Sequence, residues 1–202
     1  MAEEAAIDTS DVKNFLIGSA VTGVAFSAFT GVFTFENLAF YMLAGITVMT
    51  LREAGQRTVA HWMESYVNLK VSREGATVTL AAAVFSVVSD FSLLLMFPIY
   101  SDFSGERYEQ WGKSIDAMWM KRQYWLSSAG IIGLWTGWAG AMALSLPQMA
   151  QAIAAFTLFQ LMPFDYEKIP TDPLDGATIL RWSCFSWLLM TGLTIVMIAL
   201  TM

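Results

Sequence analysis

The chain alternates between long apolar runs and short polar segments. A helix that crosses the hydrocarbon core of a bilayer needs about 20 mostly apolar residues. The pattern therefore predicts an all-α integral membrane protein, a polytopic bundle of about six transmembrane helices, with five as the alternative count. The expected membrane segments cover residues 14–35, 37–51, 77–99, 124–146, 148–162 and 178–202.

The second apolar run contains no proline and continues into an amphipathic stretch over residues 52–67. This pattern predicts one long helix that is apolar at first and polar later. After it, Val67, Leu69 and Val71 alternate with polar residues, so a turn or short interfacial hairpin is expected over residues 68–76. Residues 100–122 form the longest polar connection. Its tryptophans and tyrosine among charged residues indicate a position at the membrane interface.

Small residues mark expected contacts between helices. Gly133 and Gly137 have the spacing at which two membrane helices approach closely, and Gly130 and Gly140 extend the same face. Residues 1–13 are acidic and lack the basic start of a secretory signal. We therefore expect a polar N-terminal tail over residues 1–13, followed by a single polytopic domain over residues 14–202. Such a chain is a multi-pass protein of the cell membrane.

The composition agrees with a membrane location. Hydrophobic residues make up 56% of the chain and charged residues 14%, whereas soluble domains carry about 25% charged residues. The formal net charge of -6 argues against a nucleic-acid partner. With one cysteine, Cys184, and one histidine, His61, the chain cannot build an internal disulfide, a multi-cysteine metal site or a bis-histidine haem site. No cofactor is expected.

A motif near the end of the chain resembles a known family. From Phe156 the sequence reads Phe-Thr-Leu-Phe-Gln-Leu-Met-Pro-Phe, and from Asp172 it reads Asp-Pro-Leu-Asp-Gly-Ala-Thr-Ile-Leu-Arg-Trp. This resembles the site-2 protease family of intramembrane zinc metalloproteases. In that family an apolar run and a Leu-Pro turn precede Pro-Leu-Asp-Gly at the start of a helix. The resemblance implies that Asp175 matches the family's third zinc ligand.

The family's other ligands lie in a His-Glu-x-x-His motif, in which two histidines on one helix face bind zinc and the glutamate is the general base. The corresponding stretch here reads Arg52-Glu-Ala-Gly-Gln56. The resemblance therefore implies that both ligand histidines are lost and that Glu53 matches the former base. Arginine is a permanent cation and cannot bind zinc. The family's Ala-Gly-Pro-x-x-Asn element is reduced to Ala-Gly-Ile-Ile-Gly-Leu at residues 129–134.

Three interpretations of these degenerate positions compete. Arg52 can replace the charge of the lost zinc and pair with Asp175, because a buried unpaired carboxylate is unfavourable. Alternatively, Glu53 and Arg57 are only an i,i+4 pair on a relic helix end. The third interpretation is a surviving metal site made of Arg52, Glu53, Gln56 and Asp175.

Asp90 is a separate candidate, because it lies inside an expected membrane segment. A charge at that depth is expected to face protein or water rather than lipid. We expect Asp90 to be a buried acid that is hydrogen-bonded to Ser86, Ser89 or Ser92.

The resemblance and the lost ligands together predict a non-enzymatic chain. We expect a membrane scaffold resembling an inactive site-2 protease, an accessory or structural subunit of a larger membrane complex such as an energy-transducing or redox assembly. Its expected partners are other integral membrane subunits and lipid. One alternative is a divergent intramembrane metalloprotease that uses Glu53 and Asp175 with a borrowed ligand. Another is a pseudoprotease that binds membrane helices and regulates their cleavage by other enzymes.

Overall fold

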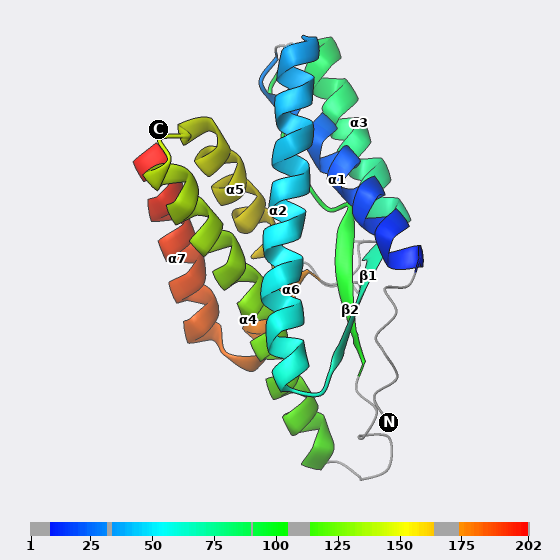
Figure 1. Cartoon of the computed structure of the whole chain (residues 1–202), viewed down its shortest axis with the longest axis vertical. Helices are drawn as coiled ribbons and strands as arrows, with labels where there is room; N and C mark the ends of the chain where they lie inside the picture. The colour runs from blue at the N-terminus through cyan, green and yellow to red at the C-terminus, as the bar shows by residue number, and fades with distance from the viewer. Residues whose placement is uncertain (1–8, 32–33, 90, 105–113, 164–173, 202) are drawn as a thin grey trace.

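The computed structural model describes residues 9–31, 34–89, 91–104, 114–163 and 174–201 (Figure 1). This part is mostly helical (79%), with seven helices and two short strands. The expectation of a helical fold is therefore confirmed. The elements in chain order are α1 Thr9–Phe29, α2 Phe35–Trp62, β1 Tyr66–Val71, α3 Arg73–Ser89, β2 Ile99–Ser104, α4 Ser114–Ala143, α5 Pro147–Gln160, α6 Asp175–Trp182 and α7 Cys184–Thr201.

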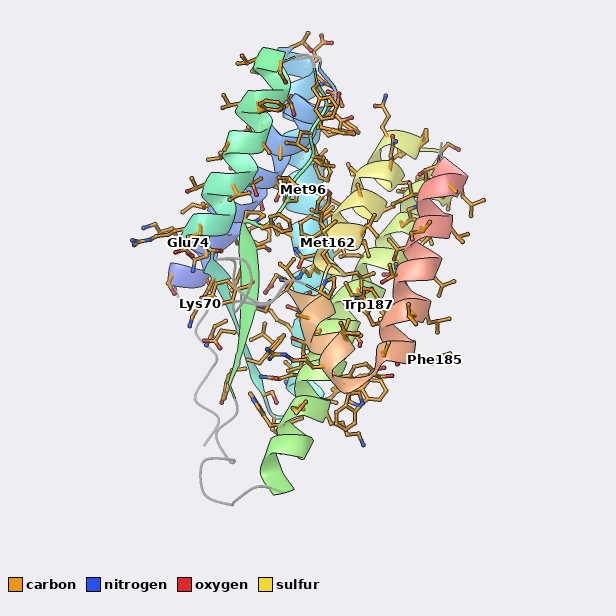
Figure 2. All side chains as sticks on the ribbon, turned by 180° about the vertical axis from the view of Figure 1, so that it is seen from behind. Lys70, Glu74, Met96, Met162, Phe185 and Trp187 are labelled. Carbon is orange, nitrogen blue, oxygen red and sulfur yellow. The ribbon has the colours of Figure 1, made fainter. Side chains whose placement is uncertain are left out.

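The helices form two groups that run roughly side by side (Figure 1). One group holds α1, α2 and α3, and the other holds α4, α5 and α7. Helix α2 joins the groups, because it packs against both α1 and α4. Buried apolar side chains of both groups form one continuous core, which includes Met49, Ile131 and Phe156. In Figure 2, Met96 lies in the interior of the fold, whereas Phe185 points outward from α7.

The contact between α2 and α4 depends on glycines. A Cβ atom on Gly55 would collide with the backbone carbonyl of Ala129, and one on Gly133 would collide with that of Leu51. A Cβ on Gly137 would collide with the Leu51 side chain. The small-residue spacing of α4 therefore allows the two backbones to approach closely. Its partner is α2, the helix that carries Arg52.

The alternating residues after α2 do form a strand, but the predicted local hairpin is wrong. Strand β1 pairs antiparallel with β2, so that Tyr66 lies opposite Ser104 and Val71 lies opposite Ile99. Helix α3 is inserted between the two strands. Alternation predicts a strand but does not identify its partner, and here the partner follows the next helix.

The single helix expected over residues 77–99 is also wrong, because α3 ends at Ser89. Residues 91–98 are not helical, and side chains of α3 bind their backbone. Ser86 Oγ donates to the carbonyl of Leu93 (2.8 Å) and lies 2.9 Å from its N–H. Thr79 Oγ1 accepts the N–H of Phe97 (3.0 Å). These bonds replace helical ones, so an apolar segment can turn back along α3. Asp90 lies outside the described residues.

The last expected segment, residues 178–202, is divided in two. Helix α6 ends before Ser183, whose backbone is extended (φ −151°, ψ 106°). The Ser183 hydroxyl then accepts the N–H of Ser186 (3.2 Å) and caps α7. Trp187 Nε1 donates to the carbonyl of Leu161 (2.7 Å), which ties α7 to the end of α5. The break gives α6 its own direction, with Asp175 at its buried end. At the other end of the chain, α1 begins at Thr9, inside the expected polar tail.

Two of the described helices are long and apolar enough to cross a membrane, over Ser10–Phe29 and Cys184–Thr201. A bundle of six spans is not confirmed. Half of the first stretch is buried inside the fold, but only 11% of the second is. Helix α7 therefore presents an apolar face to its surroundings. The large exposed apolar side chains of α7 are Phe185, Leu188, Leu189, Leu193, Ile195, Val196 and Leu200.

Candidate functional site

The structure brings together Arg52, which the sequence suggests as a replacement for the charge of a metal, and Asp175, which matches a metal ligand. Arg52 lies on the face of α2 that meets α4 and α6, and its side chain is fully buried. Its Nε donates a hydrogen bond of 2.8 Å to Oδ2 of Asp175, the first residue of α6. The Asp175 side chain is 3% exposed. Arg52 and Asp175 are therefore a buried, hydrogen-bonded ion pair.

Gln56 is the second hydrogen-bond donor to Asp175. It lies one turn after Arg52, so both side chains project from the same face of α2. Gln56 Nε2 donates to Oδ1 of Asp175 (3.2 Å) and lies 3.4 Å from Oδ2. Its Oε1 accepts a hydrogen bond from the Ser101 hydroxyl on β2 (2.8 Å). Both oxygens of Asp175 thus have donors, and the amide also ties the site to the sheet.

Glu53 connects the buried pair to the surface. Its Oε2 accepts a hydrogen bond from Arg57 Nε (3.1 Å), and its Oε1 lies 3.6 Å from Arg52 Nη1. Arg57 Nη2 in turn donates to Asp11 at the start of α1 (2.9 Å). Carboxylates and guanidinium groups therefore alternate from the core outward, in the order Asp175, Arg52, Glu53, Arg57 and Asp11. Because Arg57 is 43% exposed, its bridges are worth less than about 1 kcal/mol each.

Some hydrogen-bonding capacity in this network is unused. Within the described part, Arg52 Nη1 and Nη2 and Glu53 Oε1 are buried without a hydrogen-bond partner. At 3.6 Å the separation between Nη1 and Oε1 suits a bridging water rather than a direct bond. The guanidinium is thus held by one carboxylate and lies beside a second one, which makes the centre a charge-compensated cluster.

The sequence predicts Gly130 at a helix contact rather than at the site, and it does not point to Ser101. Gly130 on α4 lies against the cluster, and a Cβ there would be 3.0 Å from Gln56 Nε2 and 3.3 Å from Arg52 Cγ. Its lack of a side chain makes room for both. Gly130 belongs to the reduced Ala-Gly element of residues 129–134, so the family resemblance could have indicated that it lies at the site. No sequence motif points to Ser101, because its position beside Gln56 depends on the pairing of β1 with the distant strand β2.

The other residues singled out in the sequence do not join the cluster. His61 is exposed in the last turn of α2. Cys184 is exposed at the first position of α7. Among the described residues, no three histidine, cysteine, aspartate or glutamate side chains gather as a metal site would require.

A hollow of about 280 Å³ opens beside the outer part of the network. It is lined by Glu53 and Arg57 of α2, by the first turns of α1, and by Leu69 of β1. The residues that line it are Asp11, Val12, Phe15, Glu53, Arg57 and Leu69. Access from outside thus reaches Glu53, whereas Arg52 lies behind it.

Comparison with known proteins finds no matching family model, curated protein or solved structure. The likeness to site-2 proteases therefore rests on the motif residues of this chain, at positions 52–56 and 173–176.

Proposed function

We propose that this chain is a non-catalytic membrane scaffold with a site-2-protease-like arrangement, serving as an accessory or structural subunit of a larger membrane complex. One observation carries the proposal. The Arg52 guanidinium is buried against Asp175 and beside Glu53, the two positions that match a zinc ligand and a general base. The positive charge of Arg52 thus compensates the carboxylate charges that a bound metal ion would otherwise compensate.

The chemistry of these groups argues against a metalloprotease. Arginine keeps its proton at every physiological pH, so it offers no lone pair to a metal. A zinc ion close to Asp175 would also be repelled by the guanidinium charge in a site with little water. Gln56 directs its amide NH₂ rather than its oxygen at Asp175. Both residues that stand in for histidines therefore donate hydrogen bonds to the carboxylate.

The distribution of charge supports six membrane segments. Six helices contain a stretch without Asp, Glu, Lys or Arg, and these stretches cover residues 14–29, 37–51, 75–89, 123–143, 147–160 and 184–201. Helices α2 and α4 have 28 and 30 residues, or about 42 and 45 Å at 1.5 Å per residue. Both exceed the hydrocarbon thickness of about 30 Å. We therefore propose a multi-pass topology in which α1, α2, α3, α4, α5 and α7 each enter the membrane.

Exposed apolar faces support association with lipid and other membrane subunits. Helix α3 exposes Val84 (64%) and Val88 (78%), and α7 exposes Phe185 (76%) and Leu200 (64%). Contiguous apolar surface of this kind marks a membrane or protein contact. Helix α3 packs against α1, and α7 packs against α5 and α6, so neither face belongs to α2, the helix that carries Arg52.

Two measurements test this function. The chain, purified after growth with zinc, is expected to carry no stoichiometric zinc. Stoichiometric zinc that disappears in Asp175→Asn would replace the proposal with the divergent protease. A tagged chain extracted in mild detergent is expected to bring down a constant set of membrane subunits at fixed ratio. Elution as a single stable protein would remove the subunit role.

The hollow beside Glu53 favours a second candidate, a pseudoprotease that captures membrane helices. A photo-crosslinking residue at Phe15, which lines the hollow, would then trap many different membrane helices. The scaffold proposal expects few products at this position. The same crosslinking residue placed at Leu193, on the exposed face of α7, measures the background of non-specific crosslinks in the membrane.

A further inference from the structure

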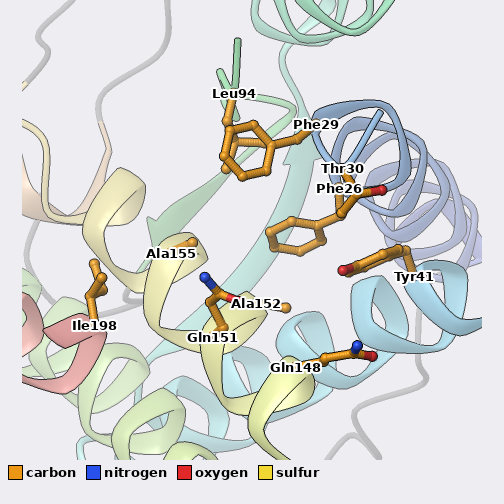
Figure 3. Close-up of a pocket in the computed structure, with 10 residues that line it drawn as sticks. All are labelled: Phe26, Phe29, Thr30, Tyr41, Leu94, Gln148, Gln151, Ala152, Ala155 and Ile198. Atoms are coloured by element: carbon orange, nitrogen blue, oxygen red, sulfur yellow. The ribbon is translucent and has the colours of Figure 1, made fainter. Parts of the chain in front are cut away.

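A second cavity lies between the two helix groups, away from the Arg52 cluster. Its volume is about 170 Å³, and it is lined by the end of α1, by α2, α5 and α7, and by Leu94 (Figure 3). Tyr41 is its α2 residue, which places the cavity about 16 Å along that helix from Arg52. The two sites are therefore independent.

Most of the cavity wall is apolar. Phe26, Phe29, Leu94, Ala152, Ala155 and Ile198 supply this part. The rings of Phe26 and Tyr41 have centroids 5.9 Å apart and tilt by 34° from each other. An apolar cavity of about 150 Å³ is large enough for one benzene ring. The space therefore suits a single flat ring.

The polar side chains of the cavity have hydrogen-bonding capacity to spare. Tyr41, Gln148 and Gln151 line it, and their side chains make no hydrogen bond within the described part of the chain. Thr30, by contrast, is already bonded to Ser27 and Asn37. In Figure 3 the Tyr41 hydroxyl and the Gln151 carboxamide lie on opposite sides of the same space. Between them they can donate hydrogen bonds to oxygen atoms of a ligand.

Among the described residues that line the cavity, none carries a charged side chain. A phosphate or carboxylate head group would therefore find no counter-charge, and a cationic one would find no acid. The ligand must be neutral, with an apolar body and a few oxygen atoms. Phe29, Gln148 and Gln151 are exposed as well as lining the cavity, so an attached chain could leave toward the surroundings.

We propose that this cavity binds the head of a neutral membrane amphiphile, a single six-membered ring with carbonyl or hydroxyl oxygens, which is the chemistry of membrane quinones. The ring packs against the aromatic side chains that line the cavity from α1 and α2, Phe26, Phe29 and Tyr41. Tyr41 and the two glutamines donate hydrogen bonds to its oxygens. The site requires neither the Arg52 cluster nor a partner subunit.

The test uses the full chain in phosphatidylcholine nanodiscs and decylubiquinone as the probe. Discs with and without the chain are captured by affinity tag, and the retained quinone is extracted and measured by absorbance. We expect saturable binding of about one quinone per chain above the partition into empty discs. Retention equal to that of empty discs would overturn the proposal. Decylbenzene, which has the ring and tail but no oxygens, is expected to bind more weakly; equal binding would also overturn it.

Variants locate the site. Gln151→Leu is expected to weaken binding about two- to tenfold, the effect of losing one hydrogen bond. The matched control is Gln123→Leu on α4, outside the cavity, which is expected to bind like the parent. Ala155→Phe fills the space from a half-buried position and is expected to abolish saturable binding, whereas Ala143→Phe at the exposed end of α4 should not. Equal binding by all four variants would show that the quinone occupies another place.

Discussion

Arg52 Nε donates a hydrogen bond of 2.8 Å to Oδ2 of Asp175, although the two residues are 123 positions apart in the chain. The bond joins the middle of α2 to the first residue of α6, and both side chains are buried. Helix α6 packs against α4 and α7. The ion pair adds a buried side-chain link from α6 to α2.

Removing one member of this pair is expected to destabilise the fold strongly. Asp175→Asn removes the charge that faces the buried guanidinium, whose nearest remaining carboxylate is then Glu53 at 3.6 Å. Breaking a buried ion pair in this way lowers the free energy of unfolding by about 3–5 kcal/mol. Denaturation followed by tryptophan fluorescence in detergent measures the change. The matched control is Asp102→Asn, which removes an exposed bridge to Lys70 and is expected to change stability by less than about 1 kcal/mol.

Replacing both members with apolar residues is expected to be milder than replacing one. Arg52→Met combined with Asp175→Leu leaves no buried charge at the pair, so the double variant should recover much of the stability that either single change loses. The four proteins form a double-mutant cycle measured under the same denaturing conditions. Losses that simply add would mean that the two charges do not interact.

The close approach of α2 and α4 predicts opposite effects for two glycines of α4. Gly133→Ala places a methyl group against the Leu51 carbonyl and should destabilise by about 1–3 kcal/mol, as overpacking does. Gly140→Ala meets no atom within 4 Å and should stabilise by up to about 1 kcal/mol through helix propensity. Thermal unfolding of both variants beside the parent measures the difference. Similar effects at the two positions would contradict a tight contact between α2 and α4.

Much of this arrangement can be predicted from the sequence, but not all of it. Helix α2 is recognisable because no proline interrupts its apolar and amphipathic halves. The positions of Arg52 and Asp175 come from a motif. Hydropathy could not show that residues 91–98 leave the helix, because the segment stays apolar and hydroxyls of Ser86 and Thr79 satisfy its backbone. The pairing of β1 with β2 was equally hidden, since strand partners depend on the tertiary fold.

The proposed membrane span of α7 predicts a strong response to charge. Leu193→Lys places a cation near the middle of an exposed apolar helix, at a penalty of about 2.5–3.5 kcal/mol for membrane insertion. Less of the variant should have the two ends of α7 on opposite sides of the membrane, as measured by labelling Cys184 and, in a separate Thr201→Cys chain, residue 201 with an impermeant thiol reagent. Leu144→Lys, in the exposed connection between α4 and α5, serves as the control and should be labelled like the parent. Equal labelling of both variants would contradict a membrane position for α7.

Zinc binding by a restored site tests most directly whether Arg52 and Gln56 occupy the places of lost metal ligands. Arg52→His combined with Gln56→His would supply two imidazoles one turn apart on the buried face of α2, opposite Asp175. Three such ligands suffice for a zinc site. Metal analysis of the folded double variant is predicted to give about one zinc per chain, and adding Asp175→Asn should remove it. A double variant that unfolds like the parent but holds no zinc would contradict the proposed origin of the Arg52–Asp175 pair.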